Sequence, residues 1–113
     1  MSNSINFNTL KKQYLTTTLP DEKHTTIMVC MPTKSLLDDL MSLETTLNLD
    51  GENQNSEEII GELYAIVAKV MSRNKGGIKI TREKLEKCLD FEDLIFYFKE
   101  YLKFVRSIST SKN

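Results

Sequence analysis

Residues 90–108 read DFEDLIFYFKEYLKFVRSI and have the clearest helical period in the chain. Apolar side chains recur there at three- and four-residue intervals, which place them on one face of an α-helix. Asp90 can cap the N-terminus of this helix. Lys99, Lys103 and Arg106 lie toward its C-terminus, where the helix dipole favours positive charge. The stretch therefore predicts an amphipathic helix, and its core-facing residues are Phe91, Leu94, Ile95, Phe98, Leu102 and Val105.

The same stretch carries four aromatic residues that lie mostly off this face, Phe96, Tyr97, Tyr101 and Phe104. One interpretation is that a neighbouring helix or loop covers them, and single exposed aromatic residues are common in any case. The other interpretation is a contiguous exposed patch, which on a monomer usually marks an interaction surface. Both interpretations lead away from catalysis.

The composition predicts an ordinary single domain. The chain has 113 residues, of which 40% are hydrophobic and 27% are charged, and its formal net charge is −1. This length suffices for one hydrophobic core and is too short for two. Because the balance is slightly acidic, a protein that works mainly by neutralising phosphates is not favoured, and nucleic-acid binding is a minority hypothesis.

Targeting and cysteine patterns predict a cytoplasmic protein. The N-terminal sequence lacks the basic start and apolar segment of a signal peptide, and no apolar run approaches the ~20 residues that span a bilayer. Cys30 and Cys88 are not in CxxC spacing and His24 is the only histidine, so a zinc site is not expected. Reduced cysteines that serve in packing fit a reducing compartment.

A β-hairpin is predicted near the N-terminus. Residues 13–19 (QYLTTTL) and 24–31 (HTTIMVCM) have strand composition, and the turn sequence PDEK separates them. Residues 1–12 are predicted to be a flexible N-terminal arm and residues 109–113 a flexible tail. Residues 13–108 would then form the single domain.

Four helices are predicted after the hairpin, over residues 34–47, 57–71, 82–89 and 90–108. The predicted N-caps of these helices are, in order, Thr33 or Ser35, Ser56, Thr81 and Asp90, and residues 48–55 are predicted to form the loop after the first helix. The second helix is apolar around more than half of its circumference, so it is either the central helix of the core or an interface helix. The predicted fold class is α+β, mostly helical, with an N-terminal hairpin followed by four helices.

Patterns for catalysis and metal binding are missing from the sequence. The acidic loop around Asp50 does not fit an EF-hand, because Asn55 and Gly61 stand where the pattern needs Gly and Glu. His24 has no signalled nucleophile or carboxylate partner, and the adjacent acidic residues near helix starts are explained by capping and dipole effects. We therefore expect no enzymatic activity, no cofactor and no metal.

Two stretches of the chain together resemble a known family. Residues 14–32 read YLTTTLPDEKHTTIMVCMP, and residues 80–98 read ITREKLEKCLDFEDLIFYF. The first resembles the Leu-Pro-Asp-Gly-Lys hairpin, and the second the short helix, Asp cap and amphipathic final helix, of the small tail assembly chaperones of long-tailed bacteriophages and prophages, especially those of Gram-positive hosts. Glu22 replaces the usual Gly, which leaves the turn type open. The resemblance covers residues 12–108.

The resemblance implies a non-catalytic chaperone that acts in the cytoplasm of a bacterial host. Such proteins bind the long, helical tape-measure protein during tail assembly, keep it soluble, help to recruit tail-tube subunits and leave before the virion is mature. A helical client needs exposed apolar surfaces on its chaperone, and we expect the chain to self-associate through part of the same surface. The candidate contact residues lie on the second and last predicted helices and are Leu63, Val67, Met71, Phe96, Tyr97, Tyr101 and Phe104.

The alternative hypothesis is a small regulatory or nucleic-acid-binding adaptor of a mobile element. In it Lys99, Lys103 and Arg106 contact phosphates beside the aromatic residues of the last helix. Retention on single-stranded DNA that falls steeply with salt would favour this hypothesis. An enzyme is the third and weakest hypothesis, because no positioned nucleophile, base or metal set can be read from the sequence.

Overall fold

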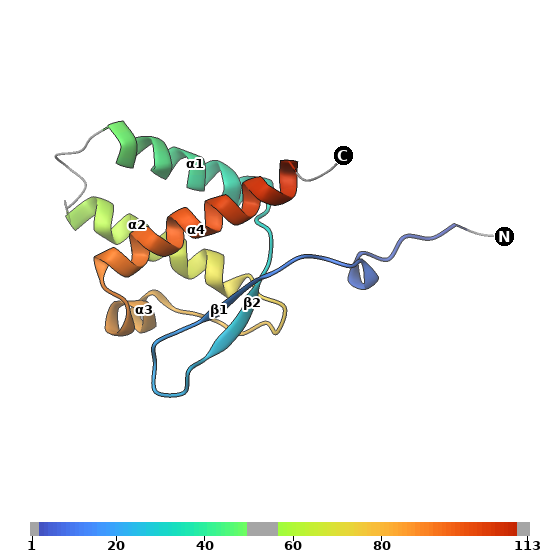
Figure 1. The fold of residues 1–113 in the computed structure, drawn as a ribbon, viewed down its shortest axis with the longest axis horizontal. Helices are drawn as coiled ribbons and strands as arrows, with labels where there is room; N and C mark the ends of the chain where they lie inside the picture. The colour runs from blue at the N-terminus through green and yellow to red at the C-terminus, as the bar shows by residue number, and fades with distance from the viewer. Residues whose placement is uncertain (1–2, 50–56, 111–113) are drawn as a thin grey trace.

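A computed structural model describes residues 3–49 and 57–110 of the chain. Figure 1 shows a hairpin packed against a group of helices, with the N-terminal arm leading away from both. Within the described residues, the predicted α+β class with an N-terminal hairpin followed by four helices is confirmed. The elements are η1 (Phe7–Thr9, a 3₁₀-helix), β1 (Leu15–Thr18), β2 (Thr26–Val29), α1 (Lys34–Leu49), α2 (Glu57–Ser72), α3 (Arg82–Cys88) and α4 (Phe91–Thr110).

The two strands pair antiparallel, with Leu15 opposite Val29, and they are shorter than the predicted runs. The other edge of β2 pairs with the chain that follows α2, where Val29 lies opposite Asn74. The backbone N–H of Cys30 donates to the carbonyl of Arg73 at 2.8 Å, and that of Lys75 donates to the carbonyl of Met28 at 2.9 Å. The segment after α2 therefore takes the free edge of β2, which a two-stranded hairpin needs because it is marginally stable alone.

Asp21 organises the hairpin turn. Its carboxylate accepts hydrogen bonds from the backbone N–H and the hydroxyl of Thr25, at 2.8 and 2.6 Å, and pairs with Lys84 of α3 at 2.9 Å. The hydrogen bond from the Thr25 hydroxyl, followed by that from Lys84, holds the pKa of Asp21 far below its usual value. The positive backbone φ of this turn, 49°, falls on His24. A glycine is therefore not required at Glu22.

Hydrogen bonds confirm the predicted N-caps of α3 and α4 and show that Thr33, one of the two residues predicted for α1, is its cap. Thr33 accepts from the N–H of Leu36 at 3.3 Å, and Thr81 accepts from the N–H of Lys84 at 3.1 Å. At the start of α4, the Asp90 carboxylate accepts from the N–H of Asp93 and the Asp93 carboxylate accepts from the N–H of Asp90, both at 2.9 Å. This reciprocal arrangement satisfies backbone donors that the first helical turn cannot satisfy itself.

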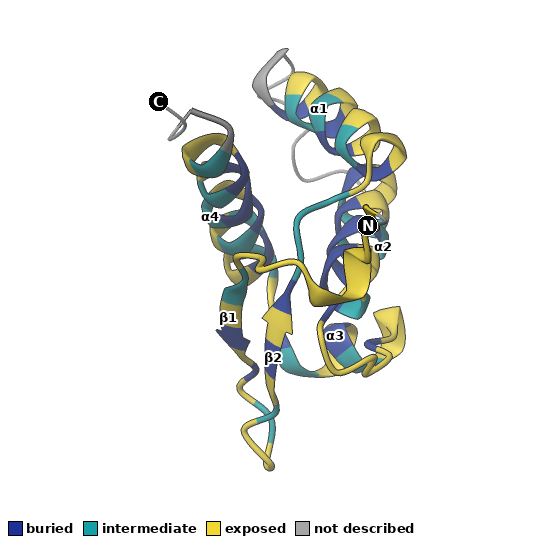
Figure 2. Ribbon diagram, turned by 90° about the vertical axis from the view of Figure 1, so that its right-hand side faces the viewer, coloured by how far each residue is buried: buried dark blue, intermediate teal, exposed yellow. Residues whose placement is uncertain are grey.

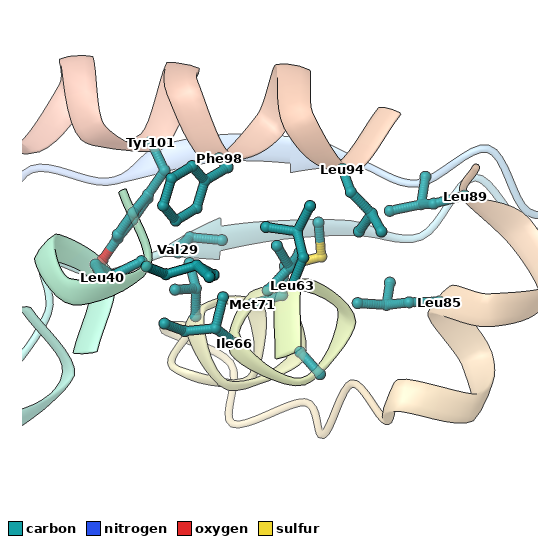
Figure 3. Packing of buried hydrophobic residues seen from close by; sticks show 14 of the residues in the cluster. Val29, Leu40, Leu63, Ile66, Met71, Leu85, Leu89, Leu94, Phe98 and Tyr101 are labelled. Carbon is teal, nitrogen blue, oxygen red and sulfur yellow. The ribbon is translucent and has the colours of Figure 1, made fainter. Parts of the chain in front are cut away.

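Helix α2 is the centre of the domain, as one of its two interpretations predicted. It packs against β2, α1, α3 and α4. Leu63, Val67 and Met71 of this helix are at most 1% exposed. Figure 3 shows Leu63, Ile66 and Met71 of α2 below Phe98 and Leu94 of α4, in one continuous apolar cluster.

A polar cluster shapes the connection from α2 to α3. The amide nitrogen of Asn74, a buried side chain, donates to the carbonyls of Met71 and Ile78, and its amide oxygen accepts from the N–H of Ile78 at 2.9 Å. The hydroxyl of Ser72 bonds both the N–H and the carbonyl of Ile80. Gly77 lies in the turn that follows the end of α2 at Ser72, and its φ of 69° is a conformation that glycine adopts without strain.

Other predicted segments fall partly outside the described residues. The predicted loop over residues 48–55 begins with the last two residues of α1, and the rest of it is not described. Helix α4 extends to Thr110, two residues past its predicted end. Within the described ranges, no helix is long and apolar enough to cross a membrane.

Candidate protein-binding groove

Helix α4 presents three faces, and each has different surroundings. The first face packs on α2 and the rest of the core through Leu94, Phe98, Leu102 and Val105, all at most 4% exposed. In Figure 2 this face of α4 is dark blue while the opposite side is yellow. The predicted core stripe is therefore correct for these four residues, and the remaining two stripe residues, Phe91 and Ile95, are half-buried.

The second face lies over the hairpin and contains both tyrosines. The hydroxyl of Tyr101 donates to the carbonyl of Cys30 at 2.7 Å, and the hydroxyl of Tyr97 forms a hydrogen bond with that of Thr17 at 2.9 Å. The Tyr97 and Tyr101 rings stack with 6.4 Å between centroids, and Phe104 lies 5.9 Å from Tyr101. This face anchors α4 to the hairpin through specific hydrogen bonds as well as apolar contact.

Burial on this face makes the hydroxyl groups of Tyr97 and Tyr101 less acidic than usual. Loss of hydration raises the pKa of Tyr97 to about 12, although its hydrogen bond to Thr17 opposes the shift. Burial likewise raises the pKa of Tyr101 well above its usual value. Both groups stay neutral at any physiological pH, so they act here as hydrogen-bonding parts of the core.

The structure corrects the predicted exposure of four candidate contact residues. Leu63, Val67, Met71 and Tyr101 are at most 1% exposed, so no partner can reach them in this conformation. The reason is that α2 is surrounded by other elements and that the hairpin covers one aromatic side of α4. Of the other three candidates, Tyr97 and Phe104 are half-buried and Phe96 is exposed.

The third face of α4 forms one wall of a groove. Phe96 is the exposed aromatic residue of this wall, with 66% of its surface accessible. The groove has a volume of about 720 Å³ and opens between α4 and the second half of α1, which contributes Glu44 and Leu47. Its apolar lining consists of Leu47, Phe91, Ile95, Phe96, Phe98 and Leu102.

Charged residues form the rim of the groove. Arg106 of α4 reaches across to Glu44 of α1 at 2.7 Å and joins the two walls at one end. The hydrogen bond to Glu44 raises the pKa of Arg106 above its usual value. Lys103 pairs with Glu100 at 3.1 Å, and Lys99 is exposed beside it. A groove with an apolar floor and a charged rim suits a ligand with one apolar face.

The groove itself was not predicted, although some of its residues were. Phe96 was identified from its position off the core stripe, whereas Phe91 and Ile95 were assigned to the core. The contribution of α1 had no sequence signal, because Leu47 belongs to an apolar stripe typical of any core helix. Only the three-dimensional placement of α1 beside α4 shows that Leu47, which is 7% exposed, borders the groove.

Residues that commonly bind metal ions do not cluster in residues 3–49 and 57–110. Within these residues, no group of three or more His, Cys, Asp or Glu side chains could hold a metal ion. Comparison of the chain with protein-family models, with curated proteins and with solved structures gave no match.

Proposed function

We propose that this protein is a non-catalytic tail assembly chaperone of a long-tailed bacteriophage or prophage, which binds the tape-measure protein during tail assembly. The observation that carries the proposal is the open apolar groove between α1 and α4, with Phe96 on its wall. The hairpin and the order of helices expected from the resemblance give it further support.

The groove suits an amphipathic helix of the client. From Phe91 to Arg106, α4 is about 22 Å long at roughly 1.5 Å per residue, which matches about four turns of a docked helix. The half-buried side chains of Phe91 and Ile95 can meet apolar residues of that helix, and the charged rim can meet its polar flanks. A tape-measure protein, being long and helical, offers such segments repeatedly.

The contact set of this proposal differs from the one predicted from sequence. It keeps Phe96, adds the half-buried groove residues Phe91 and Ile95, and omits the side chains that the core buries. Phe104 is half-buried and stacks against Tyr101 on the hairpin side. We therefore assign Phe104 to the fold, not to the binding surface.

Co-expression with the long helix-rich protein encoded next to this chain tests the proposal. We expect that protein to be recovered in the soluble fraction only with this chain, and the two to elute together in size-exclusion chromatography. Phe96→Ser should reduce the co-eluting client several-fold, because central aromatic residues carry much of the energy of such interfaces. Ile78→Ser is the matched control, since Ile78 is 43% exposed but lies outside the groove.

Either of two results would refute the proposal. The first is a client that stays insoluble in the presence of the natural chain. The second is a Phe96→Ser variant that retains the client as fully as Ile78→Ser does, which would place the contact elsewhere on the molecule.

The nucleic-acid alternative receives less support from the contacts of the basic residues. Arg106 is engaged by Glu44 and Lys103 by Glu100, so two of the three cations already have a carboxylate partner. Phosphate binding would have to compete with these ion pairs. Retention on single-stranded DNA at low salt, lost by Lys99→Gln, would reverse this preference.

A further inference from the structure

The N-terminal arm carries apolar side chains that nothing in the domain covers. Ile5 is 78% exposed, Phe7 is 70% exposed and Leu10 is 50% exposed, and every residue from 3 to 12 is classed as exposed. Figure 1 shows the arm extending away from the helices, and Figure 2 shows it in yellow along its length. Large apolar residues grouped in this way indicate a binding segment.

The arm has local order without support from the domain. The side chain of Asn6 caps η1 by accepting from the N–H of Asn8 at 3.0 Å, and the N–H of Leu10 donates to the carbonyl of Phe7 at 3.4 Å. The hydroxyl of Thr9 also donates to the carbonyl of Asn6 at 2.9 Å. This turn restricts the arm before binding, which lowers the conformational entropy that docking must offset.

The arm and the groove have matching lengths. With its 3₁₀ turn retained, the segment from Ile5 to Lys12 spans about 20 Å. The groove wall from Phe91 to Arg106 is about 22 Å long. The arm therefore supplies three apolar side chains over the distance along which the groove presents its apolar lining.

Charge fixes the direction in which the arm would lie. Residues 3–10 carry no charged side chain, and Lys11 and Lys12 follow them. At the Phe91 end of the groove, Glu92 is exposed and forms no ion pair within the described residues. The complementary arrangement places the two lysines beside Glu92 and the apolar part of the arm over the groove floor.

We propose that two copies of this chain form a dimer in which the N-terminal arm of each copy docks in the α1–α4 groove of the other. A symmetric exchange of this kind uses each groove once and closes the assembly. Two arms with three large apolar side chains each, and the groove surfaces they cover, bury roughly 1,500 Å², which lies in the range of stable interfaces. The arm and a helical client would compete for the same groove, and that consequence alone rests on the proposed function.

Size-exclusion chromatography with light scattering over a concentration series tests the dimer with no client present. We expect the natural chain to be dimeric and Phe7→Ser and Phe96→Ser each to be monomeric. Each substitution should raise the dimer dissociation constant at least about a hundredfold. The reason is that both copies carry the substitution, so both arm–groove contacts are weakened. Ile78→Ser should leave the dimer unchanged. Equal thermal unfolding of the three variants at a concentration low enough for all of them to be monomeric would show that the fold is intact.

Mixing the two monomeric variants provides a stricter test. The Phe7→Ser chain keeps an intact groove and the Phe96→Ser chain keeps an intact arm, so the mixture should form a heterodimer through one restored contact. A natural chain that stays monomeric at every concentration would overturn the proposal. A dimer that survives Phe7→Ser, or that Phe7→Ser breaks while Phe96→Ser does not, would also overturn it. The failure of client binding would not affect any of these results.

Discussion

Two faces of α4 carry similar aromatic residues and serve different purposes. On the hairpin side, Tyr97 and Tyr101 are held by hydrogen bonds to Thr17 and Cys30. On the groove side, Phe96 is 66% exposed and its ring has no hydrogen-bonding group to hold it. The comparison shows that an excess of aromatic residues on a helix can divide between stabilising a second packing contact and forming a binding surface. The polar end of a tyrosine suits the first role, because a buried hydroxyl needs a partner.

The largest effect should come from breaking the hairpin face. Tyr101→Ser removes a fully buried ring and should lower the free energy of unfolding by about 3–5 kcal/mol, as deletion of a buried aromatic side chain does. Urea denaturation followed by circular dichroism measures this loss. If the variant unfolds at the same urea concentration as the natural chain, Tyr101 is not part of the core.

A smaller effect should follow from removing only the hydroxyl of the neighbouring tyrosine. Tyr97→Phe leaves the hydroxyl of Thr17, a buried residue, without its partner on α4, which should cost about 1 kcal/mol. The same urea measurement applies, with the natural chain as reference. No change in stability would mean that the Thr17 hydroxyl needs no hydrogen bond besides the one it donates to the carbonyl of Leu15.

Substitution on the groove face, unlike substitution on the hairpin face, should leave the stability of the fold nearly unchanged. At a concentration where the natural chain is monomeric, Phe96→Ser should change the free energy of unfolding by less than about 0.5 kcal/mol, because the side chain is mostly exposed and the two residues have similar helix propensities. The contrast with Tyr101→Ser, measured in one urea series, sharpens the comparison of the two faces. A loss for Phe96→Ser as large as that for Tyr101→Ser would show that both faces are core.

The smallest effect depends on pH and concerns the hairpin turn, which the carboxylate of Asp21 holds through its hydrogen bonds. Hydrogen bonds hold the pKa of Asp21 below its ordinary value, so its contribution to stability is present above about pH 4 and is lost as the pH falls further. Between pH 5 and pH 2 the melting temperature of the natural chain should therefore fall more steeply than that of Asp21→Asn. Parallel curves would mean that the turn does not depend on this carboxylate.

Local sequence patterns were sufficient to predict most of the fold. The caps Thr33, Thr81 and Asp90 lie where predicted, because capping depends on residues within one turn of the chain. By contrast, the cluster around Asn74 connects α2 to the following segment through side-chain bonds that no local pattern indicates.

The candidate site was predicted less well, because its geometry depends on contacts between distant segments. Periodicity identified Phe96 as lying off the core stripe, and it did the same for Tyr101, which the hairpin covers from seventy-one residues away. Distinguishing the two residues requires the position of the hairpin. The α1 wall of the groove, including Leu47, likewise requires the position of α1 beside α4.

Hydroxyl-radical footprinting of the complex with the client tests most directly whether the groove face of α4 binds while its hairpin face holds the fold. Phe96 and Met28 are both exposed in the free chain, at 66% and 40%, and Met28 lies on the hairpin. With the free chain diluted until it is monomeric, we predict that client binding lowers the oxidation of Phe96 several-fold and leaves that of Met28 unchanged. Protection of Met28 without protection of Phe96 would contradict the account.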